Sequence, residues 1–177
     1  MRMRSAVVAS LAATVAALGT LVTAAPAQAA PHPNVTINIA DSYCLDIPNS
    51  NAFNGQVVQQ WPCNGTNAQQ WNILDAGASH FKIQSAAWPS FCLNNWSGGN
   101  TTGDYIKLYN NCDSPDAAFN IVGNDGGSNY IRFQPMKATS SCVNMWGGQT
   151  QGAVARLYPC SEDAPNARFR LWMSGTI

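Results

Sequence analysis

Short runs in which apolar and polar residues alternate recur along this 177-residue chain. Three of them, at 35–39, 81–84 and 131–134, show the period of two that is expected of half-buried strands. Outside the first thirty residues no stretch shows a convincing run of helical period, and polar loops rich in Gly and Asn separate the runs. The pattern therefore predicts an all-β protein.

A tripeptide that begins with cysteine returns after steps of 48 and 50 residues, at 44–46, 92–94 and 142–144. A fixed period seen three times indicates three copies of one supersecondary unit, which pack together because one copy cannot bury a core alone. We expect three such units to close on one axis as a β-trefoil with about four short strands in each unit. The expected repeats are about 33–79, 80–128 and 129–177.

Two further residue types keep the same period. A large aromatic residue near the end of each repeat predicts the shared core: Trp71, Phe119 and Phe169. A glycine stands six residues before another aromatic residue, Trp61, Tyr109 or Tyr158: these glycines are Gly55, Gly103 and Gly152. A glycine at a constant offset suggests a turn that needs a positive φ.

The beginning of the chain is typical of a secretory signal. A start that carries two arginines, at 1–4, precedes an apolar run from Ala6 to about Ala25. The Ala-x-Ala segment at 27–29 is suited to cleavage by a signal peptidase. The alternative interpretation is a membrane anchor. We expect residues 1–29 to be the signal, residues 30–177 to be a single domain, and the protein to be secreted.

Six cysteines in an exported chain favour disulfides over a metal site. Each repeat carries its own pair, so the predicted bridges are Cys44–Cys63, Cys92–Cys112 and Cys142–Cys160. Each would close a loop of about 20 residues, typically worth about 2–4 kcal/mol. No metal and no cofactor is expected, because there is no Cys-x-x-Cys and neither histidine lies near a cysteine pair.

Charged residues are sparse in the expected mature chain. Without Arg2 and Arg4, seven Lys and Arg stand against nine Asp and Glu, a formal charge of −2. This balance argues against nucleic acid or an anionic membrane as a partner. A neutral polar surface with Trp and Tyr suits a neutral ligand rich in hydroxyl groups, bound by a monomer.

The first repeat resembles the ricin-B-type lectin domain. The resemblance rests on the Cys-Leu-Asp tripeptide at 44–46, the segment 58–65 and the Gln-x-Trp mark at 69–71, and it extends over essentially the whole mature chain. In the later repeats only the aromatic of that mark is kept. The resemblance implies a secreted carbohydrate-binding protein, with galactose-type or xylose-type poly- or oligosaccharides as ligands.

The residues of the first repeat suggest how a sugar would be held. Asp46 can accept sugar hydroxyl groups through charge-assisted hydrogen bonds, and Trp61 offers a flat apolar face for a pyranose ring. Gln59 would share the face of Trp61 on a strand. The family's Asn-Gln pair reads Ala68-Gln69 here, so Asn67 is a candidate substitute. The alternatives are a turn or cap role for Asp46, a core position for Trp61 and a buried strand-tying amide for Gln69.

The other repeats replace the carboxylate with an amide. The second repeat offers four residues at matching places: Asn94, Lys107, Tyr109 and Asp116. The third offers Asn144, Arg156, Tyr158 and Asn166. Both also carry a tryptophan two residues after the asparagine, Trp96 or Trp146, which would enlarge the stacking surface or pack over a loop. We expect at least two of three sites to bind.

An enzyme is not expected, and no catalytic residue is assigned. A glycosidase needs two facing carboxylates, whereas the acidic residues are scattered among turns. No Gly-x-Ser-x-Gly motif is present, and the disulfides leave no thiol nucleophile. The main alternative to a lectin is a secreted trefoil that binds protein, either as a protease inhibitor or as a structural interaction module.

Overall fold

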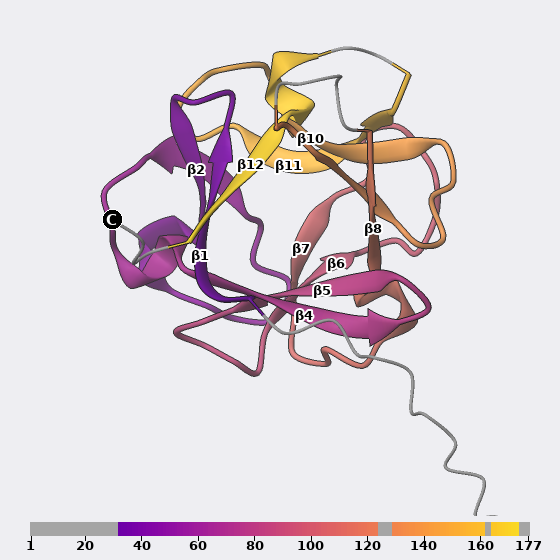
Figure 1. Cartoon of the computed structure of the whole chain (residues 1–177), viewed down its shortest axis with the longest axis horizontal. Helices are drawn as coiled ribbons and strands as arrows, with labels where there is room; N and C mark the ends of the chain where they lie inside the picture. The colour runs from indigo at the N-terminus through magenta and orange to yellow at the C-terminus, as the bar shows by residue number, and fades with distance from the viewer. Residues whose placement is uncertain (1–31, 124–128, 162–163, 174–177) are drawn as a thin grey trace, which may run out of the picture.

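A computed structural model describes residues 32–123, 129–161 and 164–173 (Figure 1). The expected signal segment, 1–29, lies outside the described residues. The strands of the first repeat are β1 (His32–Ile39), β2 (Tyr43–Asp46), β3 (Gln59–Pro62) and β4 (Trp71–Gly77). Those of the second are β5 (His80–Ser85), β6 (Cys92–Asn95), β7 (Ile106–Tyr109) and β8 (Phe119–Val122). Those of the third are β9 (Arg132–Pro135), β10 (Ser141–Trp146), β11 (Val154–Pro159) and β12 (Phe169–Met173).

Short 3₁₀ turns are the helical elements of the described ranges. They are η1 (Pro48–Ser50), η2 (Asn67–Gln69), η3 (Pro115–Ala117) and η4 (Pro165–Ala167). The last three lie immediately before β4, β8 and β12, and proline stands at the first position of η3 and η4. Nowhere in the described ranges does a helix reach the length and apolar character that crossing a membrane requires.

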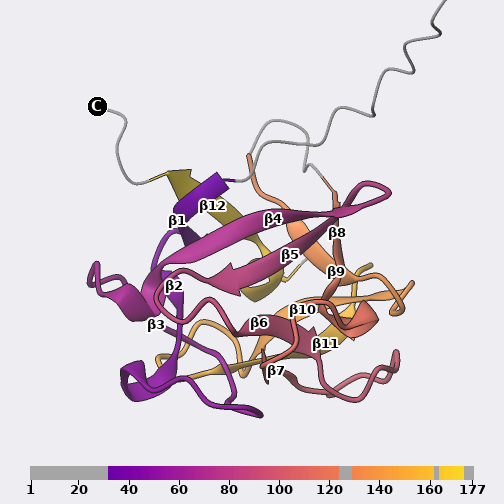
Figure 2. The same cartoon turned by 90° about the horizontal axis from the view of Figure 1, so that it is seen from below.

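The first and last strands of the three repeats form a closed barrel. Antiparallel pairing joins β1 to β4, β4 to β5, β5 to β8 and β8 to β9, and β12 pairs with β1. A bridge between Ile131 and Phe169 closes the ring between the third repeat's own strands. Figure 2 shows β1, β4 and β12 at one end of the body and β6, β7 and β11 at the other.

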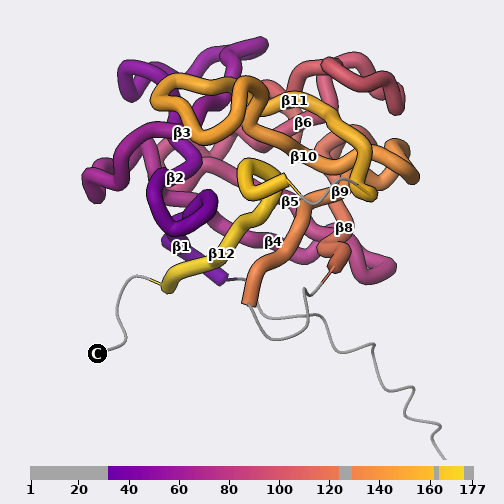
Figure 3. The backbone as a smooth tube through the Cα atoms, turned by 90° about the horizontal axis from the view of Figure 1, so that it is seen from above, coloured from indigo at the N-terminus to yellow at the C-terminus, as the bar shows by residue number. Residues whose placement is uncertain are grey.

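The middle strands of each repeat form three hairpins, β2–β3, β6–β7 and β10–β11. Bridges between neighbouring hairpins link all three in a second ring: Val154 with Gln59, Val57 with Lys107 and Tyr105 with Arg156. In the tube view the hairpins lie together above the barrel strands β1, β4 and β12 (Figure 3). This architecture is a β-trefoil with four strands in each repeat, as the sequence predicts.

The core is built from the residues that carry the repeat. Trp71, Phe119 and Phe169 are fully buried in one apolar cluster, which confirms the core predicted from their period. The alternate residues of β1 that point inward belong to the same cluster. The Trp71 indole N–H also donates a hydrogen bond to the Leu45 carbonyl oxygen, at 3.0 Å. Its polar edge is thereby satisfied, which a buried tryptophan requires.

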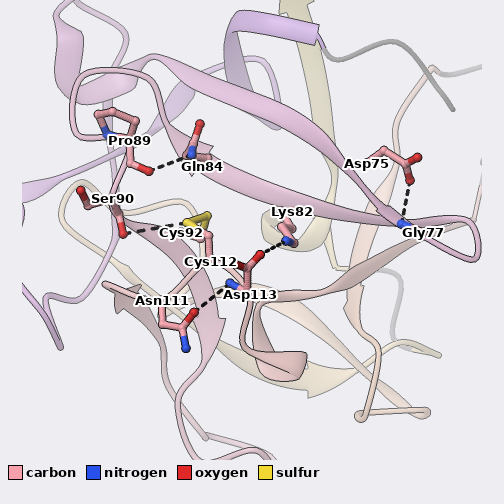
Figure 4. Close-up of polar contacts among 10 residues, drawn as sticks. All are labelled: Asp75, Gly77, Lys82, Gln84, Pro89, Ser90, Cys92, Asn111, Cys112 and Asp113. Carbon is pink, nitrogen blue, oxygen red and sulfur yellow. Dashed lines mark hydrogen bonds and ion pairs between the residues drawn. A yellow bond between two sulfur atoms is a disulfide. The ribbon is translucent and has the colours of Figure 1, made fainter.

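All three predicted disulfides are present. Cys44–Cys63, Cys92–Cys112 and Cys142–Cys160 have Cα–Cα distances of 5.0, 5.2 and 4.9 Å. Each one ties the start of a hairpin to the segment that follows its second strand. Figure 4 shows the second bridge, near an ion pair in which Lys82 Nζ lies 2.6 Å from Asp113 Oδ1.

The periodic glycines join each repeat to the next. Gly55, Gly103 and Gly152 have φ of 88°, 94° and 81°, the conformation that their constant offset predicts. Their backbone N–H groups donate to carbonyl oxygens of the following repeat, those of Leu108 and Leu157, and, around the ring, that of Gln60. The distances are 2.8, 2.8 and 2.9 Å. These bonds position the hairpins, and with them the clefts described below.

Candidate functional site

Three shallow clefts of about 250–280 Å³ lie at equivalent places in the three repeats. Each is lined by the polar residue that ends the Cys tripeptide and by an aromatic residue at or next to the end of the second hairpin strand. In the first, second and third clefts these pairs are Asp46 with Trp61, Asn94 with Tyr109, and Asn144 with Tyr158. In each repeat the structure therefore brings together the polar and the aromatic residue that the sequence predicts as sugar contacts.

Asp46 is the central polar group of the first cleft. Its Oδ1 accepts a hydrogen bond from Gln59 Nε2 at 2.8 Å, and its Oδ2 accepts one from Gln69 Nε2 at 3.2 Å. Asp46 and Gln59 stand directly opposite each other on β2 and β3. An ionised carboxylate offers about four acceptor positions, so these two bonds leave room for ligand hydroxyl groups.

Burial raises the pKa of Asp46 above its usual 3.8, and the hydrogen bonds from Gln59 and Gln69 oppose part of that rise. The Asp46 residue is only 5% exposed, although it lines the cleft. Burial disfavours the charged form, which explains the direction of the change. The carboxylate of the first cleft therefore takes up a proton at a higher pH than an ordinary aspartate does.

Gln69 fits the alternative interpretation of its role. It is fully buried, and its amide nitrogen also donates to the Pro62 carbonyl oxygen at 3.0 Å. Its Oε1 accepts from the Asn64 backbone N–H at 2.9 Å. Gln69 therefore ties the end of β3 to η2 and orients Asp46 from behind. It lies outside the lining of the first cleft.

The other wall of the first cleft comes from residues that the sequence reasoning did not single out. Asn64 and Thr66 line the cleft, and Asn64 Oδ1 accepts bonds from the Thr66 N–H at 3.1 Å and hydroxyl at 2.8 Å. Asn67, the predicted substitute, is exposed on η2 and is absent from this lining. The spacing could have found Thr66, because it stands five residues before the core aromatic Trp71, as Ser114 does before Phe119.

The second cleft is lined by two aromatic and three polar side chains: Asn94, Trp96, Tyr109, Ser114 and Asp116. Asn94 Nδ2 lies 3.5 Å from the Ser114 hydroxyl oxygen. Asp116 forms an ion pair with Lys137 at 2.9 Å. The rings of Trp96 and Tyr109 meet edge to face, with centroids 6.1 Å apart.

The third cleft repeats this design without a carboxylate among its described lining residues, which include Asn144, Trp146, Tyr158 and Asn166. Asn166 Nδ2 donates to Asn144 Oδ1 at 2.9 Å and to the Met145 carbonyl oxygen at 2.6 Å. The rings of Trp146 and Tyr158 again meet edge to face at 6.1 Å. Within the described ranges no group of three or more metal-ligating side chains is placed to hold an ion.

Trp96 and Trp146 combine the two roles that the sequence left open. They are 40% and 38% exposed, and each lines its own cleft. Each also packs against the periodic glycine of the preceding repeat. A Cβ at Gly55 would stand 3.3 Å from Trp96 Cη2, and one at Gly103 would stand 3.7 Å from Trp146 Cη2. The tryptophans therefore form cleft walls that lean on the neighbouring repeat.

Gln60 is another residue that the sequence pattern did not reveal. It is fully buried, and its Nε2 donates to the carbonyl oxygens of Gly148 and Thr150, both at 2.7 Å. The first repeat thereby holds the loop that follows Trp146 in the third cleft. No periodic signal marks this contact, because it joins segments about 90 residues apart.

Comparison with known proteins agrees with this fold. Residues 26–109, the first repeat and most of the second, match the family model "Ricin-type beta-trefoil lectin domain-like". A segment of 97 residues is 33% identical to the ribosome-inactivating protein PMRIPt of Polygonatum multiflorum. The match includes 53% of this chain but spans only 14% of that relative.

Solved structures show the same fold at low sequence identity. The designed threefold-symmetric protein ThreeFoil has a TM-score of 0.69 at 19% identity, with 77% of this chain and 96% of that chain covered. The ricin B-like lectin of Macrolepiota procera, solved in complex with lactose, has a TM-score of 0.67 at 16% identity, with coverage of 81% and 97%. Residues 26–109 thus match a ricin-type β-trefoil lectin-like domain, and the solved structures show that the described chain shares the β-trefoil fold.

Proposed function

We propose that this protein is a secreted, monomeric lectin that binds poly- or oligosaccharides through three shallow clefts and catalyses no reaction. One observation carries the proposal: each cleft places an aromatic ring beside a polar side chain that the strand pairing fixes. The ring suits the C–H face of a sugar, and the polar group suits its hydroxyl groups. Galactose-type and xylose-type sugars are the proposed ligands of the first cleft.

The absence of paired acids around the clefts supports binding without catalysis. A glycosidase uses two carboxyl groups that flank the scissile bond. Among the described lining residues, the first cleft has Asp46 as its carboxylate, the second has Asp116, and the third has none. Asp116 is moreover paired with Lys137.

Avidity would compensate for weak individual clefts. An open site that binds with a Kd of about 1 mM contributes only about −4.1 kcal/mol. Linked sites that engage one polymer raise the overall affinity by about 10²–10⁴ when their geometry allows it. Three clefts on one rigid trefoil therefore suit a polysaccharide better than a single monosaccharide.

A glycan array probed with the full chain tests the proposal. We expect retention on neutral polysaccharides, reduced by Trp61→Ala, and no release of reducing sugar from the bound glycans. The control is Trp172→Ala, because Trp172 is 56% exposed and lines none of the three clefts. Absence of binding to every glycan, or binding unaffected by the cleft substitution, contradicts the proposal.

Binding at the first cleft should weaken as the pH falls through the raised pKa of Asp46. A protonated carboxyl loses the charge assistance on which its hydrogen bonds to ligand hydroxyl groups depend. The folded protein itself gains from this protonation, since a raised folded-state pKa adds stability at low pH that is lost as the pH rises. Acidification should therefore weaken binding at the first cleft without destabilising the fold through this group.

Sugar titrations between pH 3 and pH 7, in a variant whose second and third clefts carry Tyr109→Ala and Tyr158→Ala, measure this dependence. The matched control adds Asp46→Asn, which places at this position the residue that the other repeats carry. A pH profile that is the same with aspartate and asparagine would show that Asp46 does not contact the ligand.

A further inference from the structure

The cross-strand pair that includes each cleft's Asp or Asn changes its charge from the first repeat to the others. Asp46 stands opposite Gln59 in the first repeat, whereas Asn94 stands opposite Lys107 and Asn144 opposite Arg156. Directly opposed residues have Cβ atoms about 4.5–5.5 Å apart, so each pair acts as one local charge. That charge is −1 for the ionised first pair and +1 for the second and third.

Lys107 and Arg156 belong to a continuous cation–aromatic ladder, which we define as Trp96, Lys107, Tyr105, Arg156 and Trp146. Lys107 Nζ lies 4.8 Å from the ring centroid of Trp96 and 5.1 Å from that of Tyr105. Arg156 Cζ lies 3.9 Å from the centroid of Tyr105 and 5.3 Å from that of Trp146. All four distances are within the range of cation–π contact.

The ladder joins the second cleft to the third. Trp96 lines the second cleft and Trp146 the third, and Tyr105 lies between the two cations. The backbone bridge between Tyr105 and Arg156 holds the two repeats in this register. The Arg156 guanidinium also donates a hydrogen bond to the Tyr105 hydroxyl oxygen. A polymer that occupied both clefts would therefore cross two fixed cations.

Neither cation of the ladder has a carboxylate ion-pair partner among the described residues. The ion pairs found there involve Lys82, Lys137 and Arg170, and none involves Lys107 or Arg156. Asp116 lies in the second cleft but is paired with Lys137. Because residues 30–177 carry a formal charge of −2, net charge does not favour an anion, and a preference for one would need a local group of cations such as this ladder.

We propose that the second and third clefts together bind an anionic polysaccharide, with Lys107 and Arg156 contacting the carboxylate of a uronic acid or a sulfate ester between them. This inference rests on the proposed carbohydrate-binding function and deepens it. The first cleft, which carries its own carboxylate, selects neutral sugar instead. On a polymer that contains both kinds of sugar, the first cleft would then bind the uncharged units, and the second and third clefts would bind the charged ones.

Matched polymers test this assignment. The full chain is passed over immobilised polygalacturonate and its methyl ester, and over dextran sulfate and dextran, so that charge is the difference within each pair. We expect stronger retention on at least one charged polymer than on its neutral counterpart. The pair that responds identifies carboxylate or sulfate as the anion. Equal retention within both pairs overturns the inference.

Two substitutions, Lys107→Gln and Arg156→Gln, test whether the ladder causes the effect. Each introduces glutamine, the residue that the first repeat carries at the equivalent position, Gln59. Each should weaken binding to the responding polymer roughly two- to fivefold, as expected of a partly exposed ion pair. Lys82→Gln is the control, because it removes the same charge from a lysine that pairs with Asp113 outside the ladder. Equal losses in all three variants would mean that only net charge matters and would overturn the inference.

A neutral glycan separates this inference from the function on which it rests. If the ladder variants bind every polymer as the parent does, while Trp61→Ala still lowers retention on a neutral glycan, the charge assignment alone is wrong. If the parent retains no glycan, charged or neutral, the proposed function fails as well. Melting temperatures of the variants confirm that lost retention is not lost folding.

Discussion

Replacing Trp71 by alanine should lower the free energy of unfolding by about 3–5 kcal/mol, the usual range for removing a large aromatic side chain from a core. Trp71 is fully buried and is among the largest side chains of the cluster that unites the three repeats. The change would also leave the Leu45 carbonyl oxygen without the indole N–H that it accepts. An unpaired buried acceptor adds to the destabilisation.

Chemical denaturation of Trp71→Ala and Trp172→Ala, both compared with the parent, measures this effect. The two variants lose the same side chain, but Trp172 is 56% exposed on β12. We expect a large change for Trp71 and a change within about 1 kcal/mol for Trp172, as for most surface substitutions. Similar changes in the two variants would show that Trp71 does not organise the core.

Asp46→Ala should have the largest effect on ligand binding. Hydrogen bonds to a charged group contribute about 1.5–3 kcal/mol each, so losing one weakens the first cleft by about ten- to a hundredfold. Gln69 keeps its bonds to the Pro62 carbonyl oxygen and the Asn64 N–H, so the wall behind the cleft should persist.

Calorimetric titration with a neutral sugar, in the background of Tyr109→Ala and Tyr158→Ala, isolates this effect in the first cleft. Asp113→Ala is the matched control, because Asp113 has a 91% exposed side chain that pairs with Lys82. Circular dichroism verifies the fold. Unchanged affinity after the loss of Asp46 would remove the carboxylate from the proposed site.

The repeat in the sequence carries most of the information about the fold. The spacing of Trp71, Phe119 and Phe169 predicts the shared core, because equivalent positions in a threefold structure meet at one axis. The cysteine spacing predicts the bridges for the same reason. The constant glycine predicts a positive φ, but not that its N–H donates to the next repeat.

The sites were only partly predictable from the sequence, because their walls depend on contacts that do not recur at the spacing of the repeats. Trp61, Tyr109 and Tyr158 could be placed from their constant distance of six residues after a glycine of each repeat. The carbonyl contacts of Gln60 in the third repeat could not be foreseen, since they join residues far apart in sequence. The ladder was equally hidden, because it needs the register between β7 and β11.

Equilibrium binding of the best array glycan to the parent and to a triple variant, Trp61→Ala with Tyr109→Ala and Tyr158→Ala, tests the central claim most directly. These three aromatic residues each line one cleft and lie outside the buried core. We predict that the parent binds and that the triple variant does not, while circular dichroism and melting show an intact trefoil. A folded triple variant that binds as tightly as the parent would contradict the account, because the ligand would then lie elsewhere on the molecule.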